Sequence, residues 1–185
     1  MISRKEAAKG FALIGMPGSG KTTLGRLAAQ RLAYGFADLD EWIARDANMA
    51  IPEIFRREGE PGFRERETAA LTALAALTAP DAAPAGCGSP KRVISTGGGI
   101  VAKRANLDLL HALGPIIYIK RDIGDIAASV DFAAGRPLLA DREALAALFE
   151  ARKNLYETWA DTVFVNDGSE EDAAARLAET IAAWN

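Results

Sequence analysis

The feature that most constrains this chain is the glycine-rich segment GMPGSGKTT at residues 15–23. It matches the pattern G-x-x-x-x-G-K-[ST] in full. The apolar run GFALIG (10–15) precedes it, and TTLGRLAAQRL (22–32) follows it with apolar residues at helical spacing. A buried strand that turns through glycines into a helix points backbone N–H groups and the positive helix end at one place. The segment therefore predicts a binding site for a phosphate chain.

The residues of this loop have distinct expected roles. Lys21 would reach the β- and γ-phosphates of a nucleoside triphosphate, and the Thr22 hydroxyl would be a ligand of Mg²⁺. The residues expected to contact the nucleotide are Gly18, Ser19, Gly20, Lys21, Thr22 and Thr23. A chance match is disfavoured because the loop lies between a strand and a helix. The loop alone does not separate a kinase from a GTPase or an ATP-driven machine.

Strand-like and helical segments alternate along the rest of the chain. Further strands are expected at 36–40, 92–96, 115–120 and 162–167. Helices are expected at 41–47, 52–78 with a break around EGEPG, 105–113, 122–130, 141–160 and 170–184. This alternation implies right-handed crossovers and a parallel sheet covered on both faces. We predict an α/β fold, a single three-layer α/β/α domain over residues 1–185 with a five-stranded parallel sheet.

Composition excludes several other classes of protein. A net charge of −3 and a pI near 5.3 argue against a general nucleic-acid binder. No apolar run approaches the ~20 residues that span a bilayer, and FALIGM near the N-terminus is too short for a signal peptide. The single Cys87 cannot form an internal disulfide. We expect a cytoplasmic protein without a membrane or nucleic-acid partner.

Two carboxylates, Asp38 and Asp40, stand at the end of the second expected strand. In a doubly wound sheet, the carboxyl ends of the strands line the ligand crevice. One carboxylate could hold Mg²⁺ through water while the other accepts a proton from a hydroxyl group. The alternative is that Asp40 only caps the following helix.

Alternating charges in the segment FRERE (63–67) suggest an anion-binding arginine. Arg64 and Glu67 are three residues apart and share a helix face, so the glutamate could hold the guanidinium in position for a substrate carboxylate. The alternative is a solvated run of charges.

Three glycines at 97–99 follow another expected strand, where they would let the backbone approach a ligand closely. The preceding segment, 79–91, is rich in Pro, Gly and Ala. We expect it to be an exposed loop or flexible insertion without a catalytic role.

Taken in order, these segments resemble the landmarks of shikimate kinase, a member of the P-loop, nucleoside-monophosphate-kinase-like family. The resemblance runs from Phe11 to about Ala183. The matching segments are GMPGSGKT, DLD, FRERE, GGG, RPLL at 136–139 and RKNLY at 152–156. A lone P-loop is common to many families, whereas this ordered set is specific.

The resemblance implies an acceptor site for shikimate. Asp40 would contact the ring hydroxyls and help to activate the accepting oxygen. Arg64 and Arg152 would bind the carboxylate, with Glu67 bracing Arg64, and the Gly98 backbone would contact a ring hydroxyl.

The resemblance also implies the reaction and its donor. ATP would phosphorylate the 3-hydroxyl of shikimate, giving shikimate 3-phosphate and ADP in the pathway to chorismate and the aromatic amino acids. Asp38 would orient Mg²⁺ and its waters. Arg136, on a mobile lid at about 130–141, would join Lys21 at the phosphates as a catalytic residue. A monomer is expected.

One part of the donor site departs from the family. Members often carry an arginine beside the adenine shortly before the lid, whereas 127–135 contains no basic residue. Another arginine is often found near the end of the chain, where this chain has NDGS at 166–169. The base must therefore be held differently, with Phe132 or backbone groups as candidates.

Two alternatives to a shikimate kinase remain. One is a kinase for another small sugar acid such as gluconate. The other is a catalytically weak paralogue that keeps the fold, which the missing adenine-side arginines motivate.

Overall fold

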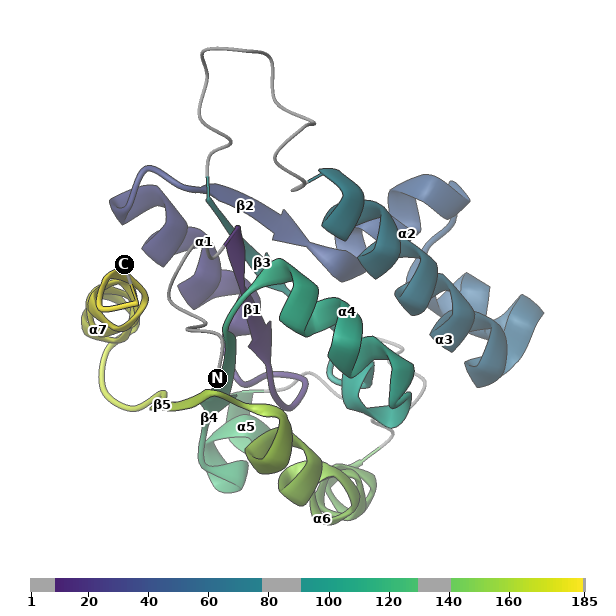
Figure 1. Ribbon diagram of the computed structural model, residues 1–185. Helices are drawn as coiled ribbons and strands as arrows, with labels where there is room; N and C mark the ends of the chain where they lie inside the picture. Colours follow the sequence, from purple (N-terminus) through teal and green to yellow (C-terminus); the bar gives the residue numbers. More distant parts are fainter. Residues whose placement is uncertain (1–8, 78–90, 130–140, 185) are drawn as a thin grey trace.

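The structure of this chain is a computed structural model that describes residues 9–77, 91–129 and 141–184 (Figure 1). Four features predicted from the sequence lie outside these ranges: Arg136 with the RPLL segment, Phe132, Cys87 and all but the last residue of the 79–91 insertion. The lid interval 130–141 enters the described part only at Asp141.

A five-stranded sheet forms the centre of the described structure. Its strand order is β2-β3-β1-β4-β5, and each adjacent pair is parallel. The strands are β1 (Gly10–Ile14), β2 (Gly35–Asp38), β3 (Arg92–Ser95), β4 (Ile116–Lys120) and β5 (Thr162–Val165). All five correspond to segments expected from the sequence, which confirms the predicted parallel α/β sheet.

Two hydrophobic cores lie on opposite faces of this sheet because successive strand residues point to opposite sides. In β1, Phe11 and Leu13 belong to one core, and Ala12 and Ile14 belong to the other. All four are fully buried. This continuous burial explains why β1 is an unbroken apolar run and not an alternating one.

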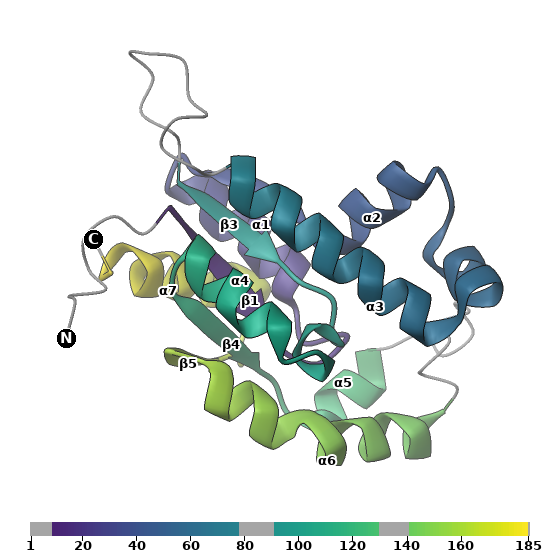
Figure 2. The same ribbon diagram turned by 45° about the vertical axis from the view of Figure 1, so that its right-hand side comes forward.

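The helices form the two outer layers (Figure 2). The core that contains Phe11 includes residues of α1 (Lys21–Arg31) and α7 (Glu170–Ala182). The other core includes residues of α2 (Leu39–Ala47), α3 (Ile51–Leu77), the 3₁₀ turn η2 (Ile100–Ala102), α4 (Ala105–Leu113), α5 (Ile123–Ser129) and α6 (Arg142–Trp159). The three-layer arrangement is therefore as predicted.

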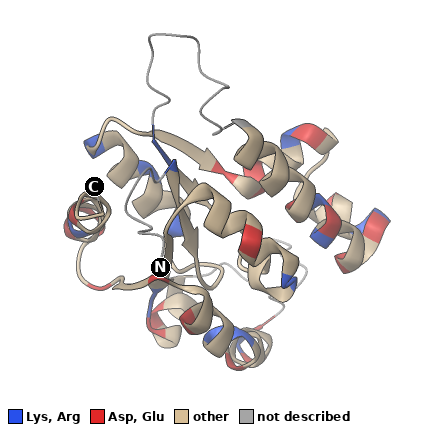
Figure 3. Ribbon diagram, viewed as in Figure 1, with Lys and Arg blue, Asp and Glu red and all other residues tan. Residues whose placement is uncertain are grey.

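The long helix α3 is broken where the sequence indicated. Gly59 has φ 68° and ψ −177° inside it, and Pro61 follows two residues later. Blue and red segments alternate along its outer part in Figure 3. Many of these charges are paired with each other, since Glu53 lies 2.7 Å from Arg56 and Glu58 lies 2.7 Å from Arg66.

The start of α2 corrects one prediction. The helix is capped by Asp38, whose Oδ1 accepts hydrogen bonds from the backbone N–H groups of Asp40 at 3.0 Å and Glu41 at 3.2 Å. Asp40 already lies inside the helix, so the capping alternative for Asp40 is wrong. The reason is that β2 ends at Asp38 and α2 begins at the next residue, earlier than expected.

Among the helices of the described ranges, none combines the length and the apolar character needed to cross a membrane.

Candidate active site

The phosphate loop connects β1 to α1 at the carboxyl edge of the sheet. Gly18 and Gly20 have φ values of 79° and 95°, which only glycine adopts easily. Lys21 is 5% exposed, and its Nζ donates to the carbonyls of Gly15 at 3.0 Å and Met16 at 2.7 Å. Ser19 is buried, and its Oγ has no hydrogen-bond partner among the described residues. The loop thus places the ammonium group of Lys21 and the hydroxyl group of Ser19 beside the backbone turn at Gly18 and Gly20.

An oxygen cluster lies next to this loop, built from three neighbouring elements. The Thr22 hydroxyl at the start of α1 donates to Asp38 Oδ2 at 2.7 Å and lies 3.1 Å from Ser95 Oγ at the end of β3. The structure thus brings together the two residues predicted to act on a metal. Hydroxyl and carboxylate oxygens are ligands that suit Mg²⁺. Within the described ranges, no group of three or more His, Cys, Asp or Glu residues could hold an ion, so phosphate oxygens and water would have to complete this site.

A cavity of about 360 Å³ opens beside the loop, and we call it the Arg64 cavity. All four predicted substrate-binding residues line it, although they come from four separate parts of the chain: Asp40, Arg64, Gly98 and Arg152. Gly18, Lys21 and Thr22 of the phosphate loop also line it. The cavity therefore places these four residues directly beside the expected phosphate position.

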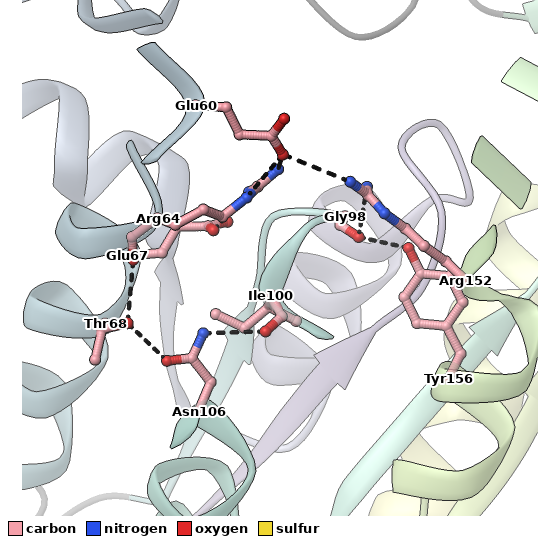
Figure 4. Close-up of polar contacts among 9 residues, drawn as sticks. All are labelled: Glu60, Arg64, Glu67, Thr68, Gly98, Ile100, Asn106, Arg152 and Tyr156. Carbon is pink, nitrogen blue, oxygen red and sulfur yellow. Dashed lines mark hydrogen bonds and ion pairs between the residues drawn. The ribbon is translucent and has the colours of Figure 1, made fainter. Parts of the chain in front are cut away.

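The two arginines of this cavity are buried and joined by one glutamate (Figure 4). Arg64 Nη1 donates to Glu67 Oε2 at 2.6 Å, and its Nη2 donates to Glu60 Oε1 at 2.7 Å. The same Glu60 oxygen lies 4.0 Å from Arg152 Nη2. The solvated-run alternative is therefore wrong for Arg64 and Glu67, which are 9% and 0% exposed. Sequence reasoning missed Glu60, although its i−4 spacing from Arg64 on a helix was a usable signal.

Burial raises the pKa of Glu67 from its ordinary value of 4.5 to about 7. The positive charge and hydrogen bond of Arg64 oppose this shift, whereas the negative charge of Asp40 adds to it. Glu67 Oε1 has no hydrogen-bond partner in the described part of the chain. Glu67 can therefore gain or lose a proton near neutral pH at the floor of the Arg64 cavity.

The three glycines allow close packing that a side chain would prevent. A Cβ on Gly97 would lie 2.8 Å from Glu67 Oε1 and 2.9 Å from Asp40 Oδ1. A Cβ on Gly99 would lie 2.1 Å from Arg64 Nη1. The glycines thus let the turn lie against the charged side chains of the protein, whereas close approach of this backbone to a ligand stays a prediction.

The Gly98 carbonyl is held by α6. It accepts hydrogen bonds from Arg152 Nη1 at 3.2 Å and from the Tyr156 hydroxyl (Figure 4). Burial raises the pKa of Tyr156 to about 12, so the hydroxyl remains a donor. The sequence marked this tyrosine only through the R-x-x-x-Y spacing and gave it no role.

A buried amide fixes the same turn from the opposite side. Asn106 is fully buried, donates to the Ile100 carbonyl at 3.0 Å and accepts from the Thr68 hydroxyl at 2.8 Å. These bonds connect α4, η2 and α3 behind the glycines (Figure 4). No sequence pattern singled out Asn106, because its importance depends on contacts between distant segments.

A second cavity, of about 540 Å³, lies along the phosphate loop, and we call it the Arg121 cavity. Like the Arg64 cavity, it is lined by Gly18, Lys21 and Thr22. Its other lining residues come from the phosphate loop, α1, the residue after β4, α5, the segment after β5 and the first residue of α7: Gly20, Thr23, Leu24, Arg121, Asp125, Ser129, Asn166, Asp167, Gly168 and Glu170. Of the residues predicted to contact the nucleotide, the six at 18–23 therefore lie around this cavity or, for Ser19, within the loop beside it, and Arg136 lies outside the described residues.

Comparison with known proteins decides the family. The family model described as shikimate kinase matches residues 17–182. The chain belongs to the shikimate kinase family. A shikimate kinase from Neisseria meningitidis serogroup C is 43% identical over 152 residues, which cover 80% of this chain and 82% of that protein. One from Cereibacter sphaeroides is 38% identical over 177 residues, covering 94% and 83%.

Solved structures of shikimate kinases share the fold. The shikimate kinase from Acinetobacter baumannii in complex with shikimate superposes with a TM-score of 0.81 at 31% identity, over 94% of this chain and 93% of that one. The shikimate kinase from Aquifex aeolicus gives a TM-score of 0.75 at 27% identity, over 93% and 95%. The family and fold predicted from the ordered motifs are thus confirmed.

The site residues named from the sequence that lie in the described ranges line one or both cavities, except two. Ser19 lies within the phosphate loop, and Asp38 contacts Thr22. The sequence missed Arg121, which follows β4 and lines the Arg121 cavity. It lies outside the two stretches, 127–135 and 166–169, that lack the arginines often found in the family. Its place at the carboxyl end of a parallel strand was the signal that could have found it. The role of Arg136 stays a prediction.

Proposed function

We propose that this chain transfers the γ-phosphoryl group of ATP to the 3-hydroxyl of shikimate, giving shikimate 3-phosphate and ADP. The observation that carries the proposal is that the Arg64 and Arg121 cavities share Gly18, Lys21 and Thr22 of the phosphate loop. A donor in one cavity would then meet an acceptor in the other at the γ-phosphate. Membership of the shikimate kinase family supports the identity of both substrates.

The acceptor would be oriented by its carboxylate. Arg64 and Arg152 are buried cations on the wall of the Arg64 cavity, and each charge-assisted hydrogen bond contributes about 1.5–3 kcal/mol. With the carboxylate at the arginines, a ring hydroxyl would lie toward Asp40 and the phosphate loop. A small hydroxylated acid fits this combination of two cations, one carboxylate and about 360 Å³.

The chemical step needs little covalent help from the protein. The 3-hydroxyl oxygen forms a bond to the γ-phosphorus as the bond between that phosphorus and the bridging oxygen of ADP breaks. ADP leaves with the bonding electrons, and the hydroxyl proton passes to Asp40 as general base. Lys21 would leave the carbonyls of Gly15 and Met16, where its Nζ now lies, to bind the β- and γ-phosphates.

Thr22 and Asp38 would hold Mg²⁺ with the nucleotide, which neutralises charge on the phosphoryl oxygens when it is bound. Their fit rests on the 2.7 Å contact between the Asp38 carboxylate and the hydroxyl of Thr22, a residue that lines both cavities. Arg136, outside the described residues, would add a further positive charge over the phosphates. We place the reaction in the cytoplasm and expect the chain to act as a monomer.

The test is an ADP-release assay with purified protein, Mg²⁺ and ATP, run with shikimate, with gluconate and without an acceptor. We expect ADP release that depends on shikimate, with the gluconate rate close to the acceptor-free background. Release that depends on gluconate instead would favour a sugar-acid kinase. Release with neither acceptor above background would favour a paralogue without turnover and would overturn the proposal.

A further inference from the structure

Arg121 is a charged residue in the wall of the Arg121 cavity, and the proposed reaction gives this residue no role. It directly follows β4, and Asn166 directly follows β5. Lys120 and Val165 are paired in the sheet, so Arg121 and Asn166 leave two neighbouring strands at the same edge. Both side chains therefore start from rigid, adjacent positions beside the phosphate loop.

These two residues contact consecutive carbonyls of that loop. Arg121 Nη1 donates to the Gly18 carbonyl at 3.2 Å, and Asn166 Nδ2 donates to the Ser19 carbonyl at 2.8 Å. Arg121 Nη1 also lies 3.3 Å from Ser129 Oγ on α5. These bonds hold the Arg121 guanidinium at the wall of the cavity while using only one of its three nitrogens.

Arg121 also differs from the other arginines of the site. Arg64 and Arg152 each lie within 4.0 Å of a carboxylate, whereas no salt bridge of Arg121 is found among the described residues. A half-buried guanidinium without a carboxylate partner keeps its planar face and remaining N–H groups available to a ligand. The loop at Asp167, held by hydrogen bonds from Arg176, supplies another part of the same cavity.

We infer that Arg121 binds the base of the nucleotide, with its guanidinium plane stacked on the ring. A phosphate chain bound at the loop 18–23 would leave the nucleoside to extend into the rest of the Arg121 cavity, where Arg121 is the one cationic side chain besides Lys21 among the described lining residues. A guanidinium over an aromatic ring is attractive through charge and through stacking. Such a contact acts on the base and leaves the triphosphate unaffected.

The inference rests on the proposed function only in requiring a nucleotide at the loop. Its test measures equilibrium binding without shikimate, so that it can fail while phosphoryl transfer is still observed. The proteins are the unaltered chain, Arg121→Ala, Arg121→Lys and, as a control for the lost charge, Arg31→Ala. Arg31 is 44% exposed and pairs with Glu171 at 3.7 Å at the far end of α1.

The probes are ADP with Mg²⁺ and inorganic tripolyphosphate with Mg²⁺, titrated by calorimetry. We expect Arg121→Ala to weaken ADP binding roughly tenfold and to leave tripolyphosphate affinity within about twofold. Arg121→Lys should fail to restore ADP affinity because it keeps the charge and loses the plane. Arg31→Ala should change neither affinity. Unfolding temperatures check that every variant is folded.

Two results would overturn the inference. Equal weakening of ADP and tripolyphosphate in Arg121→Ala, with recovery of both in Arg121→Lys, would assign Arg121 to the phosphates. Unchanged ADP affinity in Arg121→Ala would leave Arg121 without a role in nucleotide binding.

Discussion

The Arg64 cavity and the Arg121 cavity share one loop but are built in opposite ways. In the Arg64 cavity, three functional charges are buried: Arg64, Glu67 and Arg152 are each at most 9% exposed. Arg64 pairs with Glu67, and the exposed Glu60 connects Arg64 with Arg152. In the Arg121 cavity, most polar lining residues are exposed, including Thr23, Asp125 and Asp167. One cavity is a fixed polar network, and the other is an open surface around a backbone loop.

This difference indicates how each side recognises its ligand. A buried network loses much when one member is removed, because the remaining charges stay desolvated and incompletely paired. Backbone N–H groups around a phosphate do not depend on side-chain identity. Substitutions should therefore have larger effects in the Arg64 cavity than in the Arg121 cavity.

The largest effect is expected at Asp40, which lines the Arg64 cavity together with Lys21 and Thr22 of the shared phosphate loop. Asp40→Asn removes the proposed base but keeps the shape of the side chain, so kcat should fall by about 10²–10⁴-fold while ADP affinity stays unchanged. The measurement is the steady-state rate together with ADP titration. Asp46→Asn, on the same helix α2, is the matched control and should keep full activity. If Asp40→Asn kept most of the rate, Asp40 would not be the base.

Arg64→Ala tests whether the buried network stabilises the fold as well as binding substrate. It leaves Glu67 without its closest cation, and breaking a buried pair costs about 3–5 kcal/mol in the free energy of unfolding. Glu67, whose pKa is already about 7, can take up a proton when Arg64 is absent. The loss in the free energy of unfolding should therefore be near the lower end of this range. The KM for shikimate should rise about 10- to 100-fold through the lost charge-assisted contact.

The control is Arg26→Ala, which removes an ion pair with Glu41 whose side chains are 56% and 65% exposed. Exposed pairs contribute little, so urea denaturation should hardly change. The double variant Arg64→Met with Glu67→Leu should recover stability relative to Arg64→Ala without recovering the KM. Equal stability of Arg64→Ala and Arg26→Ala would contradict the idea of a cooperative buried network.

The same contrast explains what the sequence could predict. The phosphate loop, Asp40 and Arg64 belong to short local patterns whose spacing carries their chemistry, and the strands and helices followed from apolar periodicity. Asn106 acts through contacts between segments far apart, such as its hydrogen bond with Thr68 across 38 positions. Glu60 was missed although it lies on the same helix as Arg64, at a spacing of four residues. The contact of Arg121 with the phosphate loop spans 103 positions, so no local spacing predicts it, and the one available signal was its place at the carboxyl end of a parallel strand.

Substitutions of two glycines, one beside Arg64 and one in the Arg121 cavity, test whether a backbone change affects the two cavities differently. A Cβ on Gly99 would lie 2.1 Å from the Arg64 guanidinium, so Gly99→Ala should displace Arg64 and raise the KM for shikimate roughly tenfold. Gly168 in the Arg121 cavity has nothing within 4 Å of its would-be Cβ and a φ of 77°. Gly168→Ala should therefore cost about 1–2 kcal/mol of stability through strain and leave that KM unchanged. Equal KM values for shikimate in the two variants would contradict the proposed difference between the two cavities.

The smallest expected effect is a pH dependence that belongs to the Arg64 cavity alone. The folded protein raises the pKa of Glu67 from 4.5 to about 7, so between these values the folded state keeps a proton that the unfolded chain releases. The contribution of Glu67 to stability therefore falls as the pH rises from about 4.5 to about 7. Glu67→Gln should remove this part of the slope in urea denaturation measured across that range.

Substrate binding should shift the same proton. The groups that face Glu67 are Arg64 and Arg152, which favour its charged form, and Asp40, which opposes it. A substrate carboxylate at the two arginines would add negative charge, which raises the pKa of Glu67 further, so shikimate binding near pH 7 should take up a fraction of a proton. Calorimetry in two buffers of different ionisation enthalpy measures this uptake. Glu67→Gln should abolish the proton uptake, whereas Glu65→Gln, which changes an exposed neighbour on α3, should preserve it. Proton uptake that persists in Glu67→Gln would assign the proton to another group, such as the Asp40 carboxyl, which like Glu67 lies beside Gly97.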